Sequence, residues 1–159
     1  MRTAVFAGTF DPITLGHVDV VRRGLALFDE VVVSIGHNPA KSRTLSLETR
    51  VQLVEAACAS LGNVRVDTYE GLTVEHARKL GAAAILRGLR DATDLGFEAP
   101  IAHANRGMAP AIETVFVLTD PALAFVSSSL MREIVAAGGD ASRWLPPASW
   151  AALRAALRP

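Results

Sequence analysis

A ten-residue stretch near the N-terminus holds side chains suited to chemistry on a charged substrate. It runs from Gly8 to His17 (GTFDPITLGH) and joins an apolar run to an amphipathic one. A strand, a glycine turn and a helix together present backbone N–H groups and a helix N-terminus to a phosphate. Gly16 permits close approach to the backbone, and the His17 imidazole can donate to a charged oxygen. The stretch predicts a phosphate-binding turn, and the simpler alternative is an ordinary turn with a surface histidine.

A run of three serines, Ser127, Ser128 and Ser129, precedes another helical segment. Serine is favoured at helix N-caps, which explains one of the three. No acidic residue follows until Glu133, so the positive end of the helix dipole remains available to an external anion. We interpret the hydroxyls, the free N–H groups and Arg132 as a polyphosphate site.

Cationic side chains follow two further apolar runs. Arg87 and Arg90 flank Gly88 after one of them, an arrangement that suits fork-shaped binding of phosphate oxygens. Lys41 lies in the loop after the other run. Alone, Lys41 would be an ordinary solvated lysine, and one arginine an ordinary residue at a strand end. Together they predict a locally basic pocket.

The overall composition narrows the class of protein. The chain has 159 residues, of which 50% are hydrophobic and 20% charged, with 16 basic and 16 acidic side chains. This size suits one domain with its own core, and the balanced charge argues against a nucleic-acid or membrane-surface protein. The single cysteine, Cys58, is predicted to lie in the core. No signal-peptide pattern and no run of the ~20 apolar residues that span a bilayer are present, so we expect a cytoplasmic protein.

The apolar runs predict the elements that must position these residues. Short runs of Val, Ile and Leu alternate with segments of helical spacing, which is typical of a parallel sheet covered by helices on both faces. The predicted strands are 4–7, 31–35, 64–66, 83–86 and 115–118, and the predicted helices are 18–28, 47–61, 72–80 and about 92–106.

We therefore predict a single α/β domain over residues 1–159, with a Rossmann-like doubly wound parallel sheet of five strands and a short C-terminal helical tail. In such folds ligands bind at the carboxyl ends of the strands. Pro100 lies inside the helix predicted over 92–106 and should kink or restart it. The tail carries Trp150, Leu153 and Leu157 on a segment too short to be stable alone, so it should pack on the domain or on another subunit.

Two common nucleotide-binding motifs are missing from the sequence. The first apolar run is not followed by G-x-G-x-x-G, and Lys41 lacks the preceding glycine of a P-loop. The four histidines are scattered, without the spacing of metal ligands. We expect no resident metal site.

The two main motifs resemble the signatures of the nucleotidyltransferase superfamily, which shares its Gly-His motif with class I aminoacyl-tRNA synthetases. These are GTFDP at 8–12 with T-x-G-H at 14–17, and SSS at 127–129 followed by Arg132. Four further segments are similar to the bacterial adenylyltransferases that act on phosphopantetheine: NPAK at 38–41, ILRGLR at 85–90, AHANR at 102–106, and GD at 139–140 with LP at 145–146. The resemblance extends from residue 3 to about residue 157.

This resemblance implies adenylyl transfer from ATP to 4′-phosphopantetheine, which gives dephospho-CoA and pyrophosphate, the penultimate step of coenzyme A biosynthesis. It also implies Mg²⁺ carried mainly by the ATP phosphates, coenzyme A as a feedback inhibitor, and a homohexamer. A phosphate monoester is already anionic and nucleophilic. The reaction therefore needs two anions held in line with their charge neutralised, and no activated serine or general base.

The resemblance also assigns residue roles. His17 would stabilise the transition state at the α-phosphorus, and Thr9 would hold both the attacking phosphate and the α-phosphate. Arg90 and the three serines would hold the leaving β- and γ-phosphates. The catalytic residues would be Thr9, His17, Lys41 and Arg90, and the phosphopantetheine site would comprise Thr9, Lys41, Thr73 and Arg87. The ATP site would comprise Thr9, Phe10, His17, Gly88, Leu89, Arg90, Glu98, Leu123, Ala124, Phe125, Val126, Ser127, Ser128 and Ser129.

Two alternatives stay open. A sister nucleotidyltransferase would use CTP or a different phosphorylated acceptor, although Lys41 and the Arg87 segment favour phosphopantetheine. A nucleotide-binding or regulatory module would keep the fold without turnover. The intact Thr9, His17, Lys41, Arg87 and Arg90 speak against such a module.

Overall fold

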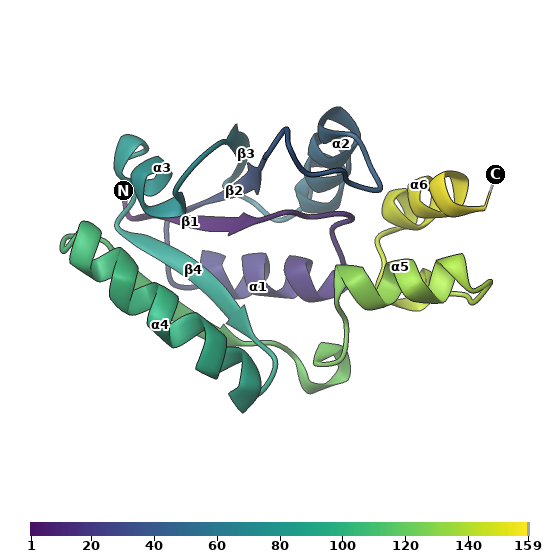
Figure 1. Cartoon of the computed structure of the whole chain (residues 1–159). Helices are drawn as coiled ribbons and strands as arrows, with labels where there is room; N and C mark the ends of the chain where they lie inside the picture. The colour runs from purple at the N-terminus through teal and green to yellow at the C-terminus, as the bar shows by residue number, and fades with distance from the viewer. Residues whose placement is uncertain (159) are drawn as a thin grey trace.

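The five strands form one parallel sheet in the computed structural model, which describes residues 1–158. They are β1 (Thr3–Gly8), β2 (Glu30–Gly36), β3 (Val64–Tyr69), β4 (Ala84–Leu89) and β5 (Glu113–Leu118). Their order is β3-β2-β1-β4-β5, so the chain builds outward from β1 and then crosses back to β4 (Figure 1). The winding changes direction between β1 and β4, and such a change leaves a crevice at the carboxyl ends. The predicted doubly wound sheet is confirmed.

Helices connect the strands and form the tail. The connecting helices are α1 (Leu15–Leu25), α2 (Leu47–Cys58), α3 (Thr73–Lys79) and α4 (Ala92–Met108). After β5 come the 3₁₀ turn η1 (Pro121–Leu123), α5 (Ser128–Ala136), the 3₁₀ turn η2 (Ser142–Trp144) and α6 (Pro147–Leu157). Within residues 1–158 no helix combines the length and the apolar character that crossing a membrane requires.

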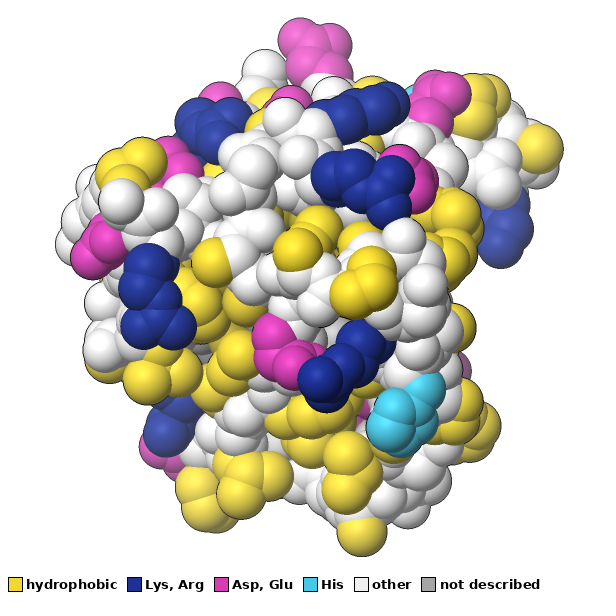
Figure 2. All heavy atoms as spheres, turned by 90° about the vertical axis from the view of Figure 1, so that its left-hand side faces the viewer, with side chains coloured by type: hydrophobic (Ala, Val, Ile, Leu, Met, Phe, Trp, Pro, Cys, Tyr) yellow, Lys and Arg dark blue, Asp and Glu magenta, His cyan; other side chains and the backbone are white. Residues whose placement is uncertain are grey.

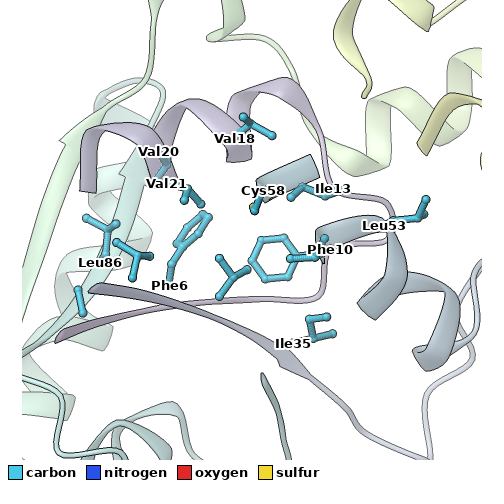
Figure 3. Close-up of a cluster of buried hydrophobic side chains, with 14 of the residues drawn as sticks. Phe6, Phe10, Ile13, Val18, Val20, Val21, Ile35, Leu53, Cys58 and Leu86 are labelled. Atoms are coloured by element: carbon cyan, nitrogen blue, oxygen red, sulfur yellow. The ribbon is translucent and has the colours of Figure 1, made fainter. Parts of the chain in front are cut away.

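The two faces of the sheet are packed separately, because successive strand residues point to opposite sides. Ala4 and Phe6 of β1 join a buried cluster with residues of α1 and α2 (Figure 3). Val5 and Ala7 join a second cluster with residues of α3. Cys58 lies in the first cluster as predicted, and burial raises the pKa of its thiol to about 11. The thiol is therefore part of the core and chemically inert at neutral pH.

Helix α4 differs from the others because none of its residues is fully buried. It continues through Pro100, so the proline does not restart the helix. Proline removes the donor that would pair with the carbonyl of Gly96, and both residues are exposed, so water can hydrate that carbonyl. The continuous helix keeps Asp94 and Glu98 one turn apart and directed toward the β4 segment.

The C-terminal tail packs on the domain, as predicted. Helices α5 and α6 enclose a small core of their own around Met131, Val135, Leu145 and Leu153. Figure 1 shows both helices beyond the carboxyl end of β1. The tail therefore supports α5, whose first turn faces the crevice at the carboxyl ends of the strands.

Candidate active site

A cavity of about 270 Å³ opens at the carboxyl end of the sheet. It is lined by the end of β1 with the turn after it, the start of α1, the end of β4 with α4, Thr119 after β5, and the start of α5. Its polar side chains are those of Thr14, His17, Arg87, Arg90, Asp94, Glu98, Thr119, Ser127 and Ser128. The Gly-His and serine motifs, more than a hundred residues apart, therefore meet in one place.

The turn after β1 adopts an unusual backbone conformation at Phe10, whose φ of 48° lies in the left-handed region. Its ring packs edge-on against the rings of Phe6 and His17, with centroids 5.4 and 5.1 Å apart. A Cβ added to Gly8 would lie 3.0 Å from the Phe10 ring, a tight contact that would push the ring from its place. Figure 3 shows the Phe6 and Phe10 rings within the buried cluster. This packing offsets the local strain and fixes the Phe10 ring beside the histidine.

His17 lies in the first turn of α1 and forms a reciprocal cap with Thr14. The Thr14 hydroxyl accepts from the His17 N–H at 3.4 Å, and His17 Nδ1 accepts from the Thr14 N–H at 3.0 Å. An Nδ1 that accepts carries no proton, so the neutral ring bears its proton on Nε2. Burial, together with the charges of Arg87 and Arg90, lowers the pKa of His17 to about 4. At neutral pH the imidazole is therefore an uncharged N–H donor.

Both arginines of the β4 segment are held by carboxylates of α4. Arg87 pairs with both oxygens of Glu98 and donates from Nη1 to the carbonyl of Ala7 at 2.8 Å. Arg90 pairs with Asp94 through Nε and Nη2, each at 2.9 Å. This hydrogen bonding raises the pKa of Arg90 and lowers the pKa of Asp94. A planar guanidinium held along one edge has a fixed orientation, so the cavity presents two oriented cations.

The glycine between these arginines serves packing. A Cβ on Gly88 would come within 2.5 Å of the Val20 side chain on α1. Because residue 88 has no side chain, α1 lies close over the end of β4. This closeness brings His17 into the same cavity as the arginines.

The residues of the serine motif have different roles. Ser127 caps α5, and no acidic residue lies in the first turn of this helix. The Ser128 hydroxyl donates to the carbonyl of Pro12 at 2.8 Å, which ties α5 to the turn after β1. Arg132 donates to the carbonyl of Asp11 in that turn and does not line the cavity, so it braces the site, and its role in the polyphosphate site stays a prediction. Ser129 is exposed.

A second cavity, of about 490 Å³, lies on the other side of the turn after β1. Its charged groups are Lys41, Arg43 and Glu70, and it also contains Thr9. The residues on either side of Thr9 line the first cavity. The turn is therefore a wall between the two cavities, and a group bound at Thr9 lies next to a group bound in the first cavity.

The structure divides the predicted site residues among these places. The first cavity is lined by Phe10, His17, Arg87, Gly88, Arg90, Glu98, Val126, Ser127 and Ser128. The second is lined by Thr9 and Lys41, so Lys41 and Arg87 lie on opposite sides of the turn. Outside both linings are Leu89, which is buried, Leu123, Ala124, Phe125 and Ser129. Thr73 also lies outside both linings, and its hydroxyl is 2.7 Å from that of Tyr69, which lines the second cavity.

Several residues of the two cavities are absent from the site predicted from the sequence. Asp94 could have been found, because it follows Arg90 by four residues at the start of a predicted helix, which is the spacing of an ion pair. Thr14 could have been found too, because it precedes His17 by three residues, which is the spacing of a reciprocal cap. Tyr69 and Arg43 lack a comparable signal, since only tertiary packing brings them to the second cavity.

The donor set of the first cavity suits anions. Within residues 1–158 no group of three or more histidine, cysteine or acidic side chains is placed to hold a metal ion. The two carboxylates of the cavity are paired with arginines. Guanidinium groups, an imidazole N–H, hydroxyls and a helix N-terminus are ligands for phosphate. The arrangement can hold two anionic groups on either side of one turn and stabilise charge that develops between them.

Comparison with known proteins gives consistent matches. The chain matches the model of the cytidylyltransferase-like family over residues 5–134. It is 50% identical over 143 residues to the phosphopantetheine adenylyltransferase of Thermosynechococcus vestitus, covering 90% of this chain and 85% of that protein. It is 48% identical over 148 residues to the enzyme of that name from Flavobacterium johnsoniae, covering 93% and 97%. A solved structure from Vibrio parahaemolyticus, a candidate nicotinate-nucleotide adenylyltransferase, shares the fold with a TM-score of 0.71 at 21% identity, over 96% of this chain and 92% of that one.

Proposed function

This chain belongs to the cytidylyltransferase-like family of nucleotidyltransferases, and we propose that it transfers the adenylyl group of ATP to 4′-phosphopantetheine. The products are dephospho-CoA and pyrophosphate, in the penultimate step of coenzyme A biosynthesis. One observation carries the proposal: two cavities with anion-binding side chains share the turn at Thr9. The activity named for the relatives supports phosphopantetheine as the acceptor.

The turn at Thr9 divides the two substrates. The triphosphate lies in the first cavity, where Arg90, the Ser127 hydroxyl and the backbone N–H groups at the start of α5, including that of Ser128, bind the β- and γ-phosphates. The rest of the ATP site comprises Phe10, Gly88, Leu89, Glu98, the segment Leu123–Val126 and Ser129. The pantetheine arm lies in the second cavity beside Thr73 and Tyr69. Its phosphate lies at Thr9, where the two cavities meet, and binds Lys41 from the second cavity and Arg87 from the first.

Transfer proceeds by in-line displacement at the α-phosphorus. An oxygen of the acceptor phosphate forms the new P–O bond, and the bond to the bridging oxygen of the β-phosphate breaks, so pyrophosphate carries away the electron pair. The second pKa of a phosphate monoester is about 6, so the acceptor is mainly dianionic at neutral pH and needs no base. His17 donates its Nε2 proton as a hydrogen bond to an α-phosphate oxygen, where charge changes most. The cap with Thr14 orients that donor before the substrates bind.

Magnesium enters with the nucleotide. The carboxylates of the first cavity are engaged by Arg87 and Arg90, and the remaining donors suit anions. Mg²⁺ usually keeps several waters and binds substrate phosphates. MgATP is therefore the substrate form.

The proposal includes assembly into a homohexamer. Helix α4 buries none of its residues within the chain, and Leu95, Phe97, Ile101 and Met108 on it are exposed. Figure 2, which views the side where α3 and α4 lie, shows hydrophobic side chains over much of this face. Covering this face in a subunit contact would remove the apolar surface from water.

The proposed function also includes an inhibitor and a cellular compartment. Coenzyme A, which shares the adenylyl and pantetheine parts of the product, competes at both cavities as a feedback inhibitor. The setting is the cytoplasm, where a lone thiol such as that of Cys58 stays reduced.

The direct test is product identification by mass. The chain is incubated with Mg²⁺, 4′-phosphopantetheine and either ATP or CTP, and a third mixture omits the acceptor. Dephospho-CoA and pyrophosphate formed with ATP and the acceptor, but no product with CTP, would support the proposal. The cytidylyl product would establish the sister activity, and ATP bound without pyrophosphate release would indicate a binding module.

A further inference from the structure

Arg50 is a buried cation that the proposed reaction does not use. It lies on α2, is 1% exposed, and shares the buried face of the helix with Leu53, Val54 and Cys58. Within residues 1–158 its hydrogen-bond partners are two backbone carbonyls and no carboxylate. A charged side chain on the apolar face of a helix is unusual and calls for a reason.

Both carbonyls belong to the wall of the second cavity. Nη1 of Arg50 donates to the Thr9 carbonyl at 2.8 Å and to the Gly36 carbonyl at 3.4 Å. Thr9 follows β1 and Gly36 ends β2, so the guanidinium joins the ends of the two central strands. Both residues line the second cavity.

Stability alone does not account for this arginine. Removing a guanidinium from water is costly unless its donors find partners, and Nε of Arg50 is buried without one in the described chain. Burial lowers the pKa of Arg50, and the nearby charge of Asp11 only opposes that shift. An apolar side chain of similar size would fill the same space without this cost.

The turn held by Arg50 is braced from the opposite side as well. Arg132 and Ser128 of α5 donate to the carbonyls of Asp11 and Pro12. Those contacts fix the far half of the turn, toward α1. Arg50 contacts the near half, at the residue that separates the two cavities.

We infer that Arg50 is a positioning residue that holds Thr9 in line between the acceptor phosphate and the α-phosphate. The inference rests on the proposed function, because it assigns Thr9 to both phosphates. Displacing a reacting group by about 1 Å can lower a rate by about 10². Arg50 therefore acts on turnover through the backbone of Thr9 without touching either substrate.

The test compares Arg50→Lys and Arg50→Met with the wild-type chain. Lysine keeps a positive charge with a single donor nitrogen, and methionine keeps only volume. The kcat should therefore fall by about tenfold for lysine and about a hundredfold for methionine, with both KM values within about threefold of wild type. Arg78→Met is the matched control, because Arg78 donates to the Met108 carbonyl at 2.8 Å and lies outside both cavity linings. Its kcat should be unchanged. An Arg50→Met chain with kcat within twofold of wild type would overturn the inference.

A double-mutant cycle separates positioning from a general loss of structure. If Arg50 acts through Thr9, then Thr9→Ala combined with Arg50→Met should have the kcat of Thr9→Ala alone. Defects that multiply would overturn the inference, and so would a Thr9→Ala chain with normal kcat. Amide exchange gives a readout without turnover: Arg50→Met should speed exchange across residues 8–14 and leave α5 unchanged. Unchanged exchange in the turn would overturn the inference, whereas a wild-type chain that forms no dephospho-CoA would refute the proposed function instead.

Discussion

The two cavities share one wall but hold their polar groups in different ways. In the first, each main ligand has a protein partner: Thr14 fixes His17, Glu98 holds Arg87, and Asp94 holds Arg90. In the second, Lys41 lies on an exposed loop that is tied mainly to itself, through the bond from the Lys41 N–H to the Asn38 carbonyl at 3.0 Å. We therefore expect the first cavity to be organised before substrate arrives, and the Lys41 loop of the second cavity to order on binding.

This difference matches what each cavity has to do. Groups that act on developing charge contribute most when they need no reorganisation during the reaction. Groups that only bind an acceptor can order on binding, at a cost in affinity. Changes to groups that act on the α-phosphate, such as His17, should therefore lower kcat, and changes to groups that only bind one substrate should raise the KM of that substrate.

The largest effect is expected at His17. His17→Ala removes a preoriented donor to charge on the α-phosphate, so kcat should fall by about 10²–10³, or about 3–4 kcal/mol, with little change in either KM. Steady-state kinetics with both substrates varied measures this. An unchanged thermal unfolding temperature shows that the variant is folded. A near-normal kcat would remove the distinction between the two cavities.

Arg87 tests where the border between the substrates lies, because it lines the first cavity while the proposal gives it to the acceptor phosphate. Arg87→Ala should raise the phosphopantetheine KM by about 10–100-fold, and the ATP KM much less. Lys41→Ala is the companion variant from the second cavity and should show the same selectivity with a smaller effect. Equal losses for both substrates with Arg87→Ala would place this arginine with ATP.

Ser128 should show the reverse selectivity with a modest size. Its hydroxyl donates to the Pro12 carbonyl, so its proton is not free for phosphate, and the helix N–H groups beside it remain in the variant. Ser128→Ala should raise the ATP KM by about threefold to tenfold and leave the acceptor KM nearly unchanged. Kinetics with ATP varied at saturating acceptor measures this. A selective rise in the acceptor KM would contradict the division of the pocket.

Much of the fold was predictable because it depends on local pattern. The central strands are apolar on both faces, so short runs such as that around Val32 identify them without tertiary information. Two strands were predicted too short. The edge strand β3 extends to Tyr69, because its alternate residues are polar and carry less signal. The inner strand β4 extends to Leu89, because Arg87 and Gly88 interrupt its apolar run. Helix α1 begins at Leu15, before the predicted start, because the Thr14 cap precedes the apolar pattern.

The site was less predictable because partners decide what a polar side chain does. The Arg87 segment and the Gly-His motif could be found as cations and donors near strand ends. Their orientation depends on Glu98 and on the close contact at Gly88, which exist only in the folded chain. Arg50 has helical spacing with Leu53 and Val54, which places it on the apolar face, but only tertiary structure shows that it reaches Thr9.

The smallest expected effect concerns pH: His17 should add nothing to the pH dependence of kcat/KM. Its folded-state pKa is about 4, below the ordinary 6.5, so the ring stays neutral and keeps its Nε2 proton between pH 5.5 and 8. Wild-type rates will still fall on the acid side, because the acceptor phosphate takes up a proton with a pKa of about 6. Dividing the wild-type kcat/KM by that of His17→Ala removes this substrate titration, since both enzymes use the same acceptor. The ratio should stay constant within about twofold from pH 5.5 to 8, because kcat/KM reports ionisations of the free enzyme and free substrate. A ratio that changes tenfold around pH 6.5 would mean that His17 titrates there, and the neutral donor held by Thr14 would no longer explain catalysis.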